Sequence, residues 1–165
     1  MNVEQKINKA ELNLQRKLDW VSKHDTRVAF TTSIVIAMLG VLVNASAAIK
    51  SWEWYIYIFF GLSLALLFAC LVLIYMSQFP KTTSVNTSLI FFGTVASMKF
   101  DEFKKRFIAS TEDDYLDDLL SQTHKNAEIL CKKFKYLKAT LVLILISVIP
   151  WLLTIYYSKI FIKNV

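Results

Sequence analysis

The stretch Trp54–Met76, WYIYIFFGLSLALLFACLVLIYM, decides the class of this protein. Its 23 residues contain no Asp, Glu, Lys, Arg or His. A helix needs roughly 20 apolar residues to cross the ~30 Å hydrocarbon layer of a membrane, because its backbone amides must be satisfied internally. Trp52 and Trp54 at one end and Tyr75 at the other are typical of the aromatic belts at membrane interfaces. The stretch therefore predicts a transmembrane helix.

Two further stretches also contain no Asp, Glu, Lys, Arg or His and are long enough to cross a membrane, namely residues 28–49 and residues 139–158. Pro150 in the last of them is expected to kink a span rather than abolish it. A soluble chain of 165 residues could not cover three such helices, and 55% of the residues are hydrophobic against a globular norm of about 45–50%. We predict an all-α membrane protein with three transmembrane helices.

The distribution of Lys and Arg predicts the orientation. Six of the 19 precede residue 28, ten lie between the second and third spans, and Lys50 stands alone between the first two. An internal N-terminus places 16 of them in the cytoplasm, as the positive-inside rule favours. No signal peptide is expected, because the first 27 residues are charged throughout. The predicted segments are 1–27 (cytoplasmic helix), 28–49, 54–76 and 139–158 (transmembrane), 77–138 (cytoplasmic sensor segment) and 159–165 (external tail), with an external turn at 50–53.

The cytoplasmic part is expected to contain two long helices. Residues 2–23 carry apolar side chains at three- and four-residue steps, which predicts an amphipathic helix that runs into the first span. Residues 110–114 combine a hydroxyl cap with acids in the first turn, which is typical of a helix start. From there a heptad seam continues into the third span through Leu116, Leu120, Thr123, Ala127, Leu130, Phe134, Leu137 and Leu141. We call residues 112–138 the stalk, and expect it to pack on the N-terminal helix or on a copy of itself.

The segment between these helices is predicted from its composition. Residues 82–98 carry no charge but are too polar to span a membrane, and a re-entrant loop is the alternative there. We expect a short extended or turned element at 88–93 against the stalk, then a short helix at 99–109. Gly93 follows two aromatic residues, a pattern that often marks a close approach of the backbone, sometimes to a ligand.

Polar side chains on one flank of the stalk are candidate ligand contacts. Gln122, Asn126 and Lys133 each precede a seam position by one residue, at the predicted rim of the buried interface. Their amides suit the edge of a heterocycle and the ammonium suits a phosphate, while a solvated helix flank is the alternative. Asp25 and Arg27 precede the first span, where they could cap the helix and reach lipid headgroups, or could face inward.

Several classes of chemistry are not expected. Cys70 and Cys131 have no CxxC spacing, and His24 and His124 have no second ligand at helical spacing, so neither a redox pair nor a metal site is predicted. The sequence has no GxSxG, HExxH or phosphate-loop motif, so no enzyme activity and no cofactor are expected. Lys and Arg are interspersed with acids, which does not favour binding to a nucleic acid polymer.

From about residue 18 to residue 155 the chain resembles the small membrane effectors of Pycsar, a bacterial antiphage system in which a pyrimidine cyclase makes cyclic UMP or cyclic CMP. The resemblance rests on an ordered set of residues: Leu18-Asp19-Trp20, Asp25-Thr26-Arg27, Phe79-Pro80, Leu89-Ile90-Phe91-Phe92-Gly93, Leu119-Leu120-Ser121-Gln122, Asn126 and Lys133. Arg27 stands where the family usually has a lysine, which conserves charge but not geometry.

This resemblance implies a homo-oligomeric effector of the bacterial inner membrane, not an enzyme. A cyclic pyrimidine nucleotide from the companion cyclase would bind its cytoplasmic helices, and the effector would then damage the membrane and stop phage propagation. The nucleotide contacts that we expect are Asp25, Arg27, Phe92, Gln122, Asn126 and Lys133. The alternative function is a constitutive membrane scaffold or channel subunit without a nucleotide site.

Overall fold

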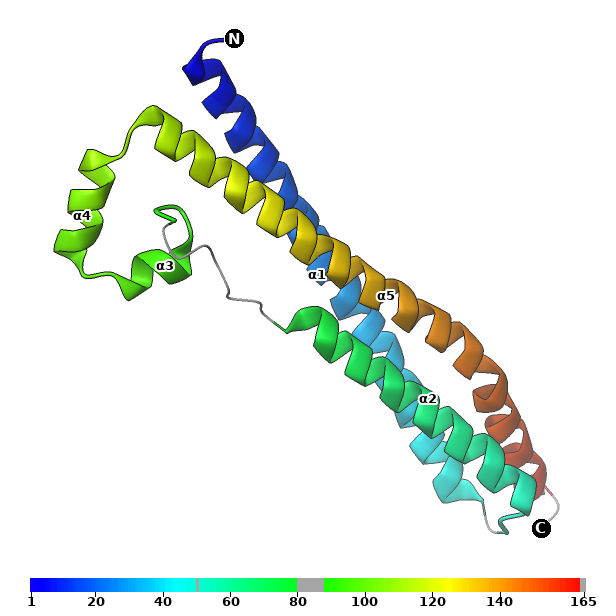
Figure 1. The fold of residues 1–165 in the computed structure, drawn as a ribbon. Coiled ribbons are helices and arrows are strands. Elements are labelled where there is room, and N and C mark those ends of the chain that lie inside the picture. The colour runs from blue at the N-terminus through cyan, green and yellow to red at the C-terminus, as the bar shows by residue number, and fades with distance from the viewer. Residues whose placement is uncertain (50, 80–87, 164–165) are drawn as a thin grey trace. The chain divides into compact units, whose positions relative to one another are not determined.

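The computed structural model describes residues 1–49, 51–79 and 88–163, with side chains to residue 160. It contains five helices in this part of the chain, and no strand: α1 (Val3–Ala48), α2 (Trp54–Gln78), α3 (Phe92–Ser97), α4 (Phe100–Ala109) and α5 (Glu112–Lys163) (Figure 1). Lys50 of the predicted turn, residues 80–87 of the sensor segment and residues 164–165 of the tail lie outside the described residues.

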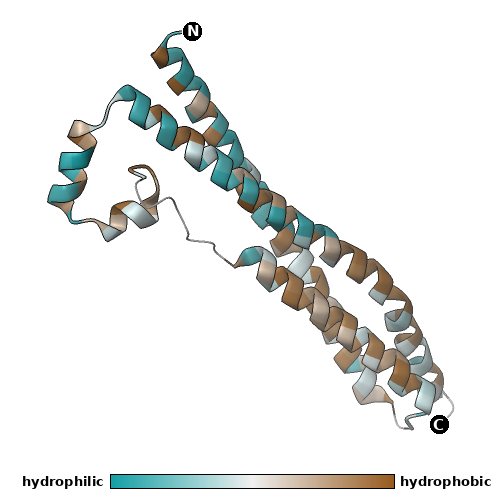
Figure 2. Cartoon of the chain, in the orientation of Figure 1, coloured by the Kyte–Doolittle hydropathy of each residue, from teal (hydrophilic) through white to brown (hydrophobic). Residues whose placement is uncertain are grey.

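Three helices are long and apolar enough to cross a membrane, namely α1, α2 and α5. This confirms the all-helical prediction with three membrane-spanning candidates. Figure 2 shows the apolar residues gathered along α2 and along parts of α1 and α5. Of the most apolar 18 residues of each helix, only 22–28% are buried in the structure. Many of the other apolar side chains are exposed, as contact with lipid requires.

The chain divides into two compact units. We call residues Asp25–Phe79 with Lys133–Val165 the apolar unit, and residues Met1–His24 with Pro80–Lys132 the polar unit. Helices α1 and α5 each belong in part to both units.

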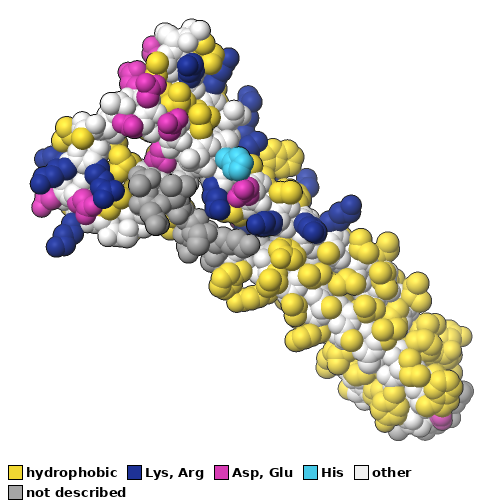
Figure 3. All heavy atoms as spheres, viewed as in Figure 1, with side chains coloured by type: hydrophobic (Ala, Val, Ile, Leu, Met, Phe, Trp, Pro, Cys, Tyr) yellow, Lys and Arg dark blue, Asp and Glu magenta, His cyan; other side chains and the backbone are white. Residues whose placement is uncertain are grey.

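Aliphatic side chains and short polar ones make the interior of the apolar unit, and outward hydrophobic side chains cover its face in Figure 3. Val35, Leu42 and Leu67 are fully buried there. Buried hydroxyls such as those of Thr140 and Thr154 donate to the carbonyl oxygen four residues earlier in the same helix. These internal bonds let polar side chains lie among apolar ones without an unsatisfied group.

A hydrogen bond from a side chain to the backbone joins α5 to α1 within the apolar unit. The indole N–H of Trp151 donates to the carbonyl oxygen of Met38 at 2.9 Å. Trp151 follows Pro150, and α5 continues through this proline, so the proline does not end the predicted helix.

In the polar unit the stalk packs on the N-terminal part of α1. The Tyr115 hydroxyl donates to Glu11 Oε1 at 2.9 Å, and Ala10 and Leu119 are buried. The sequence allowed the stalk to pack on the N-terminal helix or on a copy of itself. In the structure the stalk packs on the N-terminal helix.

The buried face of the stalk differs from the predicted seam in this unit. Leu120 was placed in the seam but is 49% exposed, whereas Leu119 is 2% exposed and Gln122 is 5% exposed. The seam prediction is therefore wrong at Leu120. Successive residues point about 100° apart on a helix, so the buried face is displaced by one position.

The prediction of an extended or turned element at 88–93 is only partly correct. Residues 88–91 lie outside the helices, but Phe92 and Gly93 are the first residues of α3. The Ser88 hydroxyl oxygen accepts the backbone N–H groups of Ile90 and Phe91, which turns the chain. The Phe91 carbonyl then accepts the N–H groups of Thr94 and Val95, which starts α3 at Phe92. The last two residues of the predicted element are therefore helical.

Candidate functional site

An ion pair joins α1 and α5 in the apolar unit. The Lys133 ammonium donates to Asp25 Oδ1 at 3.0 Å. The Lys133 side chain is 14% exposed, and that of Asp25 is 43% exposed. The structure thus brings together two of the predicted site residues, which are far apart in the sequence. The ammonium is largely removed from water, while the carboxylate retains access to it.

Helix α2 forms a hydrogen bond to the backbone of α5 at Lys133. The Ser77 hydroxyl donates to the carbonyl oxygen of Lys133 at 3.2 Å. Ser77 is itself buried and lies in the last turn of α2. The ion pair therefore lies where segments of all three long helices meet within the apolar unit.

Arg27, the third predicted contact in this unit, lies in a different setting. It lines a groove of about 550 Å³ between α1 and α5, together with Lys138 and mostly apolar side chains. Neither Asp25 nor Lys133 lines this groove.

The other three predicted residues belong to the polar unit. Gln122 is buried. Its backbone carbonyl oxygen accepts a hydrogen bond of 2.8 Å from Asn126 Nδ2, one turn later in α5. The amide nitrogen of Asn126 is therefore engaged within the helix, and its oxygen is the atom available to accept from a ligand. Phe92 is 71% exposed at the start of α3, with its ring 4.7 Å from that of Phe91.

The backbone at Gly93 makes the predicted close approach, and the group that it approaches is the ring of Phe91. A Cβ atom at this position would lie 2.6 Å from Cε1 of Phe91. A side chain at this position would require the Phe91 ring to move. This approach is therefore explained without a ligand.

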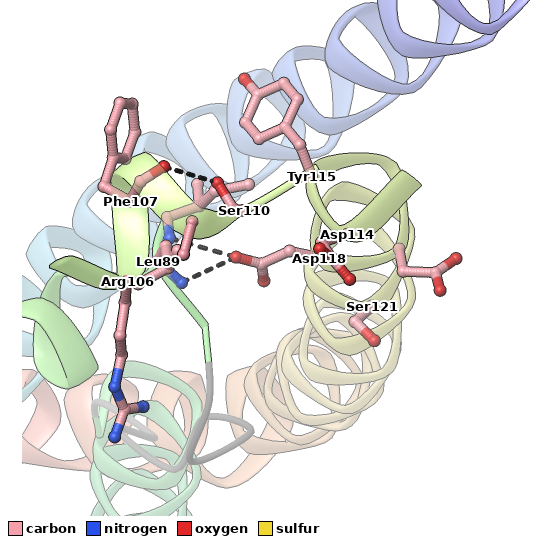
Figure 4. Close-up of a pocket in the computed structure, with 11 residues that line it drawn as sticks. Leu89, Arg106, Phe107, Ser110, Asp114, Tyr115, Asp118 and Ser121 are labelled. Atoms are coloured by element: carbon pink, nitrogen blue, oxygen red, sulfur yellow. Dashed lines mark hydrogen bonds between the residues drawn. The ribbon is translucent and has the colours of Figure 1, made fainter. Parts of the chain in front are cut away.

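A cavity of about 500 Å³ lies in the polar unit beside the turn at 88–91, the end of α4 and the start of α5 (Figure 4). Asp118 Oδ2 accepts the backbone N–H groups of Leu89 at 2.8 Å and Ile90 at 3.2 Å. This carboxylate ties the turn to the stalk. The expectation that the segment lies against the stalk is thus confirmed for residues 88–91.

The cavity is lined largely by polar side chains that the sequence did not single out as ligand contacts. None of the six predicted contacts lines it. Its lining residues are Leu89, Ile90, Arg106, Phe107, Ala109, Ser110, Asp114, Tyr115, Asp117, Asp118 and Ser121. Carboxylates can accept hydrogen bonds from ligand hydroxyl and N–H groups, and a guanidinium can bind a phosphate.

Two lining residues have perturbed acid–base properties. Hydrogen bonds from the backbone N–H and the hydroxyl of Thr111 lower the pKa of Asp114. The hydrogen bond to Glu11, with burial as a smaller cause, raises the pKa of Tyr115. The backbone N–H of Asp114 donates to Thr111 Oγ1, so Thr111 is the hydroxyl cap of α5 that the helix-start pattern predicted. The sequence accounted for the acids at this helix start by capping and solvation, and no local signal showed that the turn at 88–91 would complete a cavity beside them.

Within the described ranges 1–49, 51–79 and 88–163, no group of three or more His, Cys, Asp or Glu side chains could hold a metal ion. Cys70 is a buried free thiol and Cys131 an exposed one.

Comparison with known proteins identifies the family. No solved structure matches the chain. The Pycsar effector protein GmPycTM of Gulbenkiania mobilis is 24% identical over 169 aligned positions, which cover 81% of this chain and 86% of that protein. The Pycsar effector protein domain, PycTM, matches residues 9–158, a range that begins in the N-terminal helix and extends to the end of the third apolar stretch. The chain therefore belongs to the PycTM family of Pycsar effector proteins.

Proposed function

We propose that this protein is an antiphage effector of the bacterial inner membrane that is activated by cyclic UMP or cyclic CMP. In this proposal a companion pyrimidine cyclase makes the nucleotide, and activation impairs membrane integrity and causes abortive infection. The observation that carries the proposal is the family match over residues 9–158, which includes all three apolar stretches and the stalk. The proposed role is not enzymatic.

The proposed orientation places the N-terminus in the cytoplasm and the C-terminus in the periplasm. The charge distribution supports it, because 16 of the 19 Lys and Arg residues then lie on the cytoplasmic side. This orientation exposes the polar unit to a nucleotide made inside the cell.

Lys133 is the proposed phosphate contact. A cyclic phosphate that binds its ammonium would compete with Asp25, which holds it at 3.0 Å. Such an exchange replaces one charge-assisted hydrogen bond by another, and so it carries a small net electrostatic cost. Asp25 and Lys133 lie three and six residues before the apolar stretches that begin at residues 28 and 139, so their separation would loosen α1 from α5 near the point of membrane entry.

Gln122, Asn126 and Phe92 are proposed as base contacts, each to be tested singly. The Asn126 amide oxygen can accept from the N–H or amino group of a pyrimidine edge, and the exposed Phe92 ring offers a stacking surface. Gln122 is buried, so its proposed role requires a ligand that reaches the interior of the polar unit.

Activation is proposed to involve self-association. To change a resting population from about 1:99 to 99:1, the nucleotide must bind the active form about 10⁴-fold more tightly, which is about 5.5 kcal/mol. An assembly that completes the nucleotide site only in the active form would supply this preference. Light scattering of the purified protein with and without cyclic UMP tests this part, since the proposal requires a ligand-dependent change in mass.

Calorimetry of the full-length protein in lipid nanodiscs tests the ligand. We expect submillimolar binding of cyclic UMP or cyclic CMP, and much weaker binding of cyclic AMP and cyclic GMP. No binding of either pyrimidine nucleotide would contradict the proposal. Lys133→Ala should lower the affinity at least tenfold, whereas Lys132→Ala changes an exposed neighbour and should leave it unchanged. If Arg106→Ala abolishes binding and Lys133→Ala does not, the nucleotide site is the cavity beside α4 instead.

A constitutive scaffold or channel subunit is the alternative function. Growth of cells that express the protein with an active cyclase, with an inactive cyclase and without one distinguishes the two. The effector proposal predicts toxicity only with the active cyclase. Equal toxicity, or none, in all three strains would favour the alternative.

A further inference from the structure

The groove that contains Arg27 combines two cations with an apolar floor. Its lining residues are Thr26, Arg27, Phe30 and Thr31 from α1, and Phe134, Leu137, Lys138 and Leu141 from α5. All eight belong to the apolar unit, and the groove volume is about 550 Å³.

The two cations lie at matching positions along their helices. Arg27 is the last charged residue before the apolar stretch 28–49, and Lys138 is the last before the stretch 139–158. Because both helices run from these residues into apolar sequence, both side chains are at the level where a membrane changes from headgroups to hydrocarbon. Cations at this level can reach phosphate oxygens of lipids.

No acid in the described part of the groove competes for these cations. Its lining contains no Asp or Glu, and the nearby Asp25 is bonded to Lys133. Within the residues that the structure describes, neither Arg27 nor Lys138 forms an ion pair with a carboxylate. The groove therefore has a net positive charge that an anionic ligand would complement.

The apolar part of the groove argues for a lipid. Phe30 is 70% exposed and Leu141 is 51% exposed, one turn or less beyond the cations toward the hydrocarbon. A soluble phosphate would use the cations but leave these two side chains uncovered. A lipid uses both features, because its acyl chain can pack on Phe30 and Leu141 while its phosphate is held by Arg27 and Lys138.

We propose that this groove is a binding site for an anionic glycerophospholipid, such as phosphatidylglycerol. Arg27 and Lys138 bind the headgroup phosphate, and Phe30 and Leu141 contact the first part of an acyl chain. The proposal gives Arg27 a ligand other than the nucleotide that the sequence suggested for it, and it is independent of the proposed function.

Native mass spectrometry of the full-length protein in detergent tests the proposal, with dioleoylphosphatidylglycerol and dioleoylphosphatidylcholine as probes. Each cation near a membrane surface contributes about fivefold to the affinity for an anionic lipid. We expect Arg27→Gln and Lys138→Gln each to weaken phosphatidylglycerol binding about fivefold, and the double variant about 25-fold, with phosphatidylcholine binding unchanged. Arg27→Lys keeps the charge and should retain most of the affinity.

Lys135→Gln is the matched control, because Lys135 is an exposed cation one turn before Lys138 that does not line the groove. It should change phosphatidylglycerol binding less than twofold. An equal loss in this control would overturn the proposal, since the preference would then reflect diffuse charge. A double variant that retains the lipid preference would also overturn it.

Competition on the unmodified protein keeps the test independent of folding in the variants. Inorganic phosphate and cyclic UMP, each in excess over the lipid, should not displace phosphatidylglycerol. Displacement by either one would show that the cations bind a soluble anion and would overturn the assignment to a lipid.

Discussion

The Asp25–Lys133 ion pair makes an asymmetric prediction about stability. Asp25→Ala leaves an ammonium whose side chain is only 14% exposed, without its carboxylate. Lys133→Met leaves a carboxylate whose side chain is 43% exposed and can be solvated, and it fills the space of the lysine with an apolar chain. The substitution of the aspartate should therefore destabilise the protein more than that of the lysine, although both remove the same 3.0 Å contact.

The magnitudes follow from the two exposures. Removing one partner of a fully buried ion pair costs about 3–5 kcal/mol. Water reaches the carboxylate here and screens the pair, so we expect about 2 kcal/mol for Asp25→Ala. For Lys133→Met we expect about 0.5–1 kcal/mol, because a solvated carboxylate carries little desolvation cost. The double variant should cost less than the sum of the two single changes by about 1 kcal/mol.

Unfolding of the detergent-solubilised protein by SDS, followed by circular dichroism, measures these free energies. Lys132→Met is the control, as it changes an exposed residue of the same turn and should be nearly neutral. Equal losses for the two single variants, or strict additivity in the double variant, would refute the reasoning. Either result would mean that the pair is fully hydrated and couples α1 to α5 only weakly.

Three further predictions concern single side chains. Trp151→Phe removes the hydrogen bond to the Met38 carbonyl and should cost about 1 kcal/mol in the same SDS assay, and a loss below about 0.3 kcal/mol would show that the bond contributes nothing measurable. Hydrogen bonds from Thr111 lower the pKa of Asp114. The ionised carboxylate therefore stabilises the first turn of α5 fully above the ordinary carboxyl pKa of 3.8, and this stabilisation is lost as the pH falls through the lower pKa of the folded protein. Amide protection in that turn should therefore decrease on acidification, and Asp114→Asn should remove this dependence; a dependence that persists in the variant would assign it to another acid. Cys131 is exposed, so a membrane-impermeant maleimide should label it in inverted membrane vesicles but not in intact spheroplasts, with Cys131→Ser as the control. Labelling in spheroplasts would contradict the proposed orientation.

The helices themselves were predictable because their signals are local. The absence of charge over Trp54–Met76 indicates α2 without any knowledge of its neighbours. The start of α5 at Glu112 follows from a hydroxyl and an acid within one turn of each other, and Thr111 and Asp114 form the expected bonds. The family resemblance was likewise carried by the order of short motifs along the chain, and it is confirmed by the match over residues 9–158.

The pairing of residues across helices was decided only by the tertiary structure. A heptad pattern in a long helix leaves the buried face uncertain by one position, and the neighbours of the stalk bury Leu119 and Gln122 rather than Leu120. Asp25 and Lys133 were both candidate residues, but their contact depends on how α1 lies against α5. Asp118 accepts two backbone N–H groups only because the turn at 88–91 packs on the stalk. Hydropathy and capping depend on neighbours in sequence and can be seen in the chain alone, whereas the partner of a side chain depends on the rotation of each helix about its axis, which packing determines.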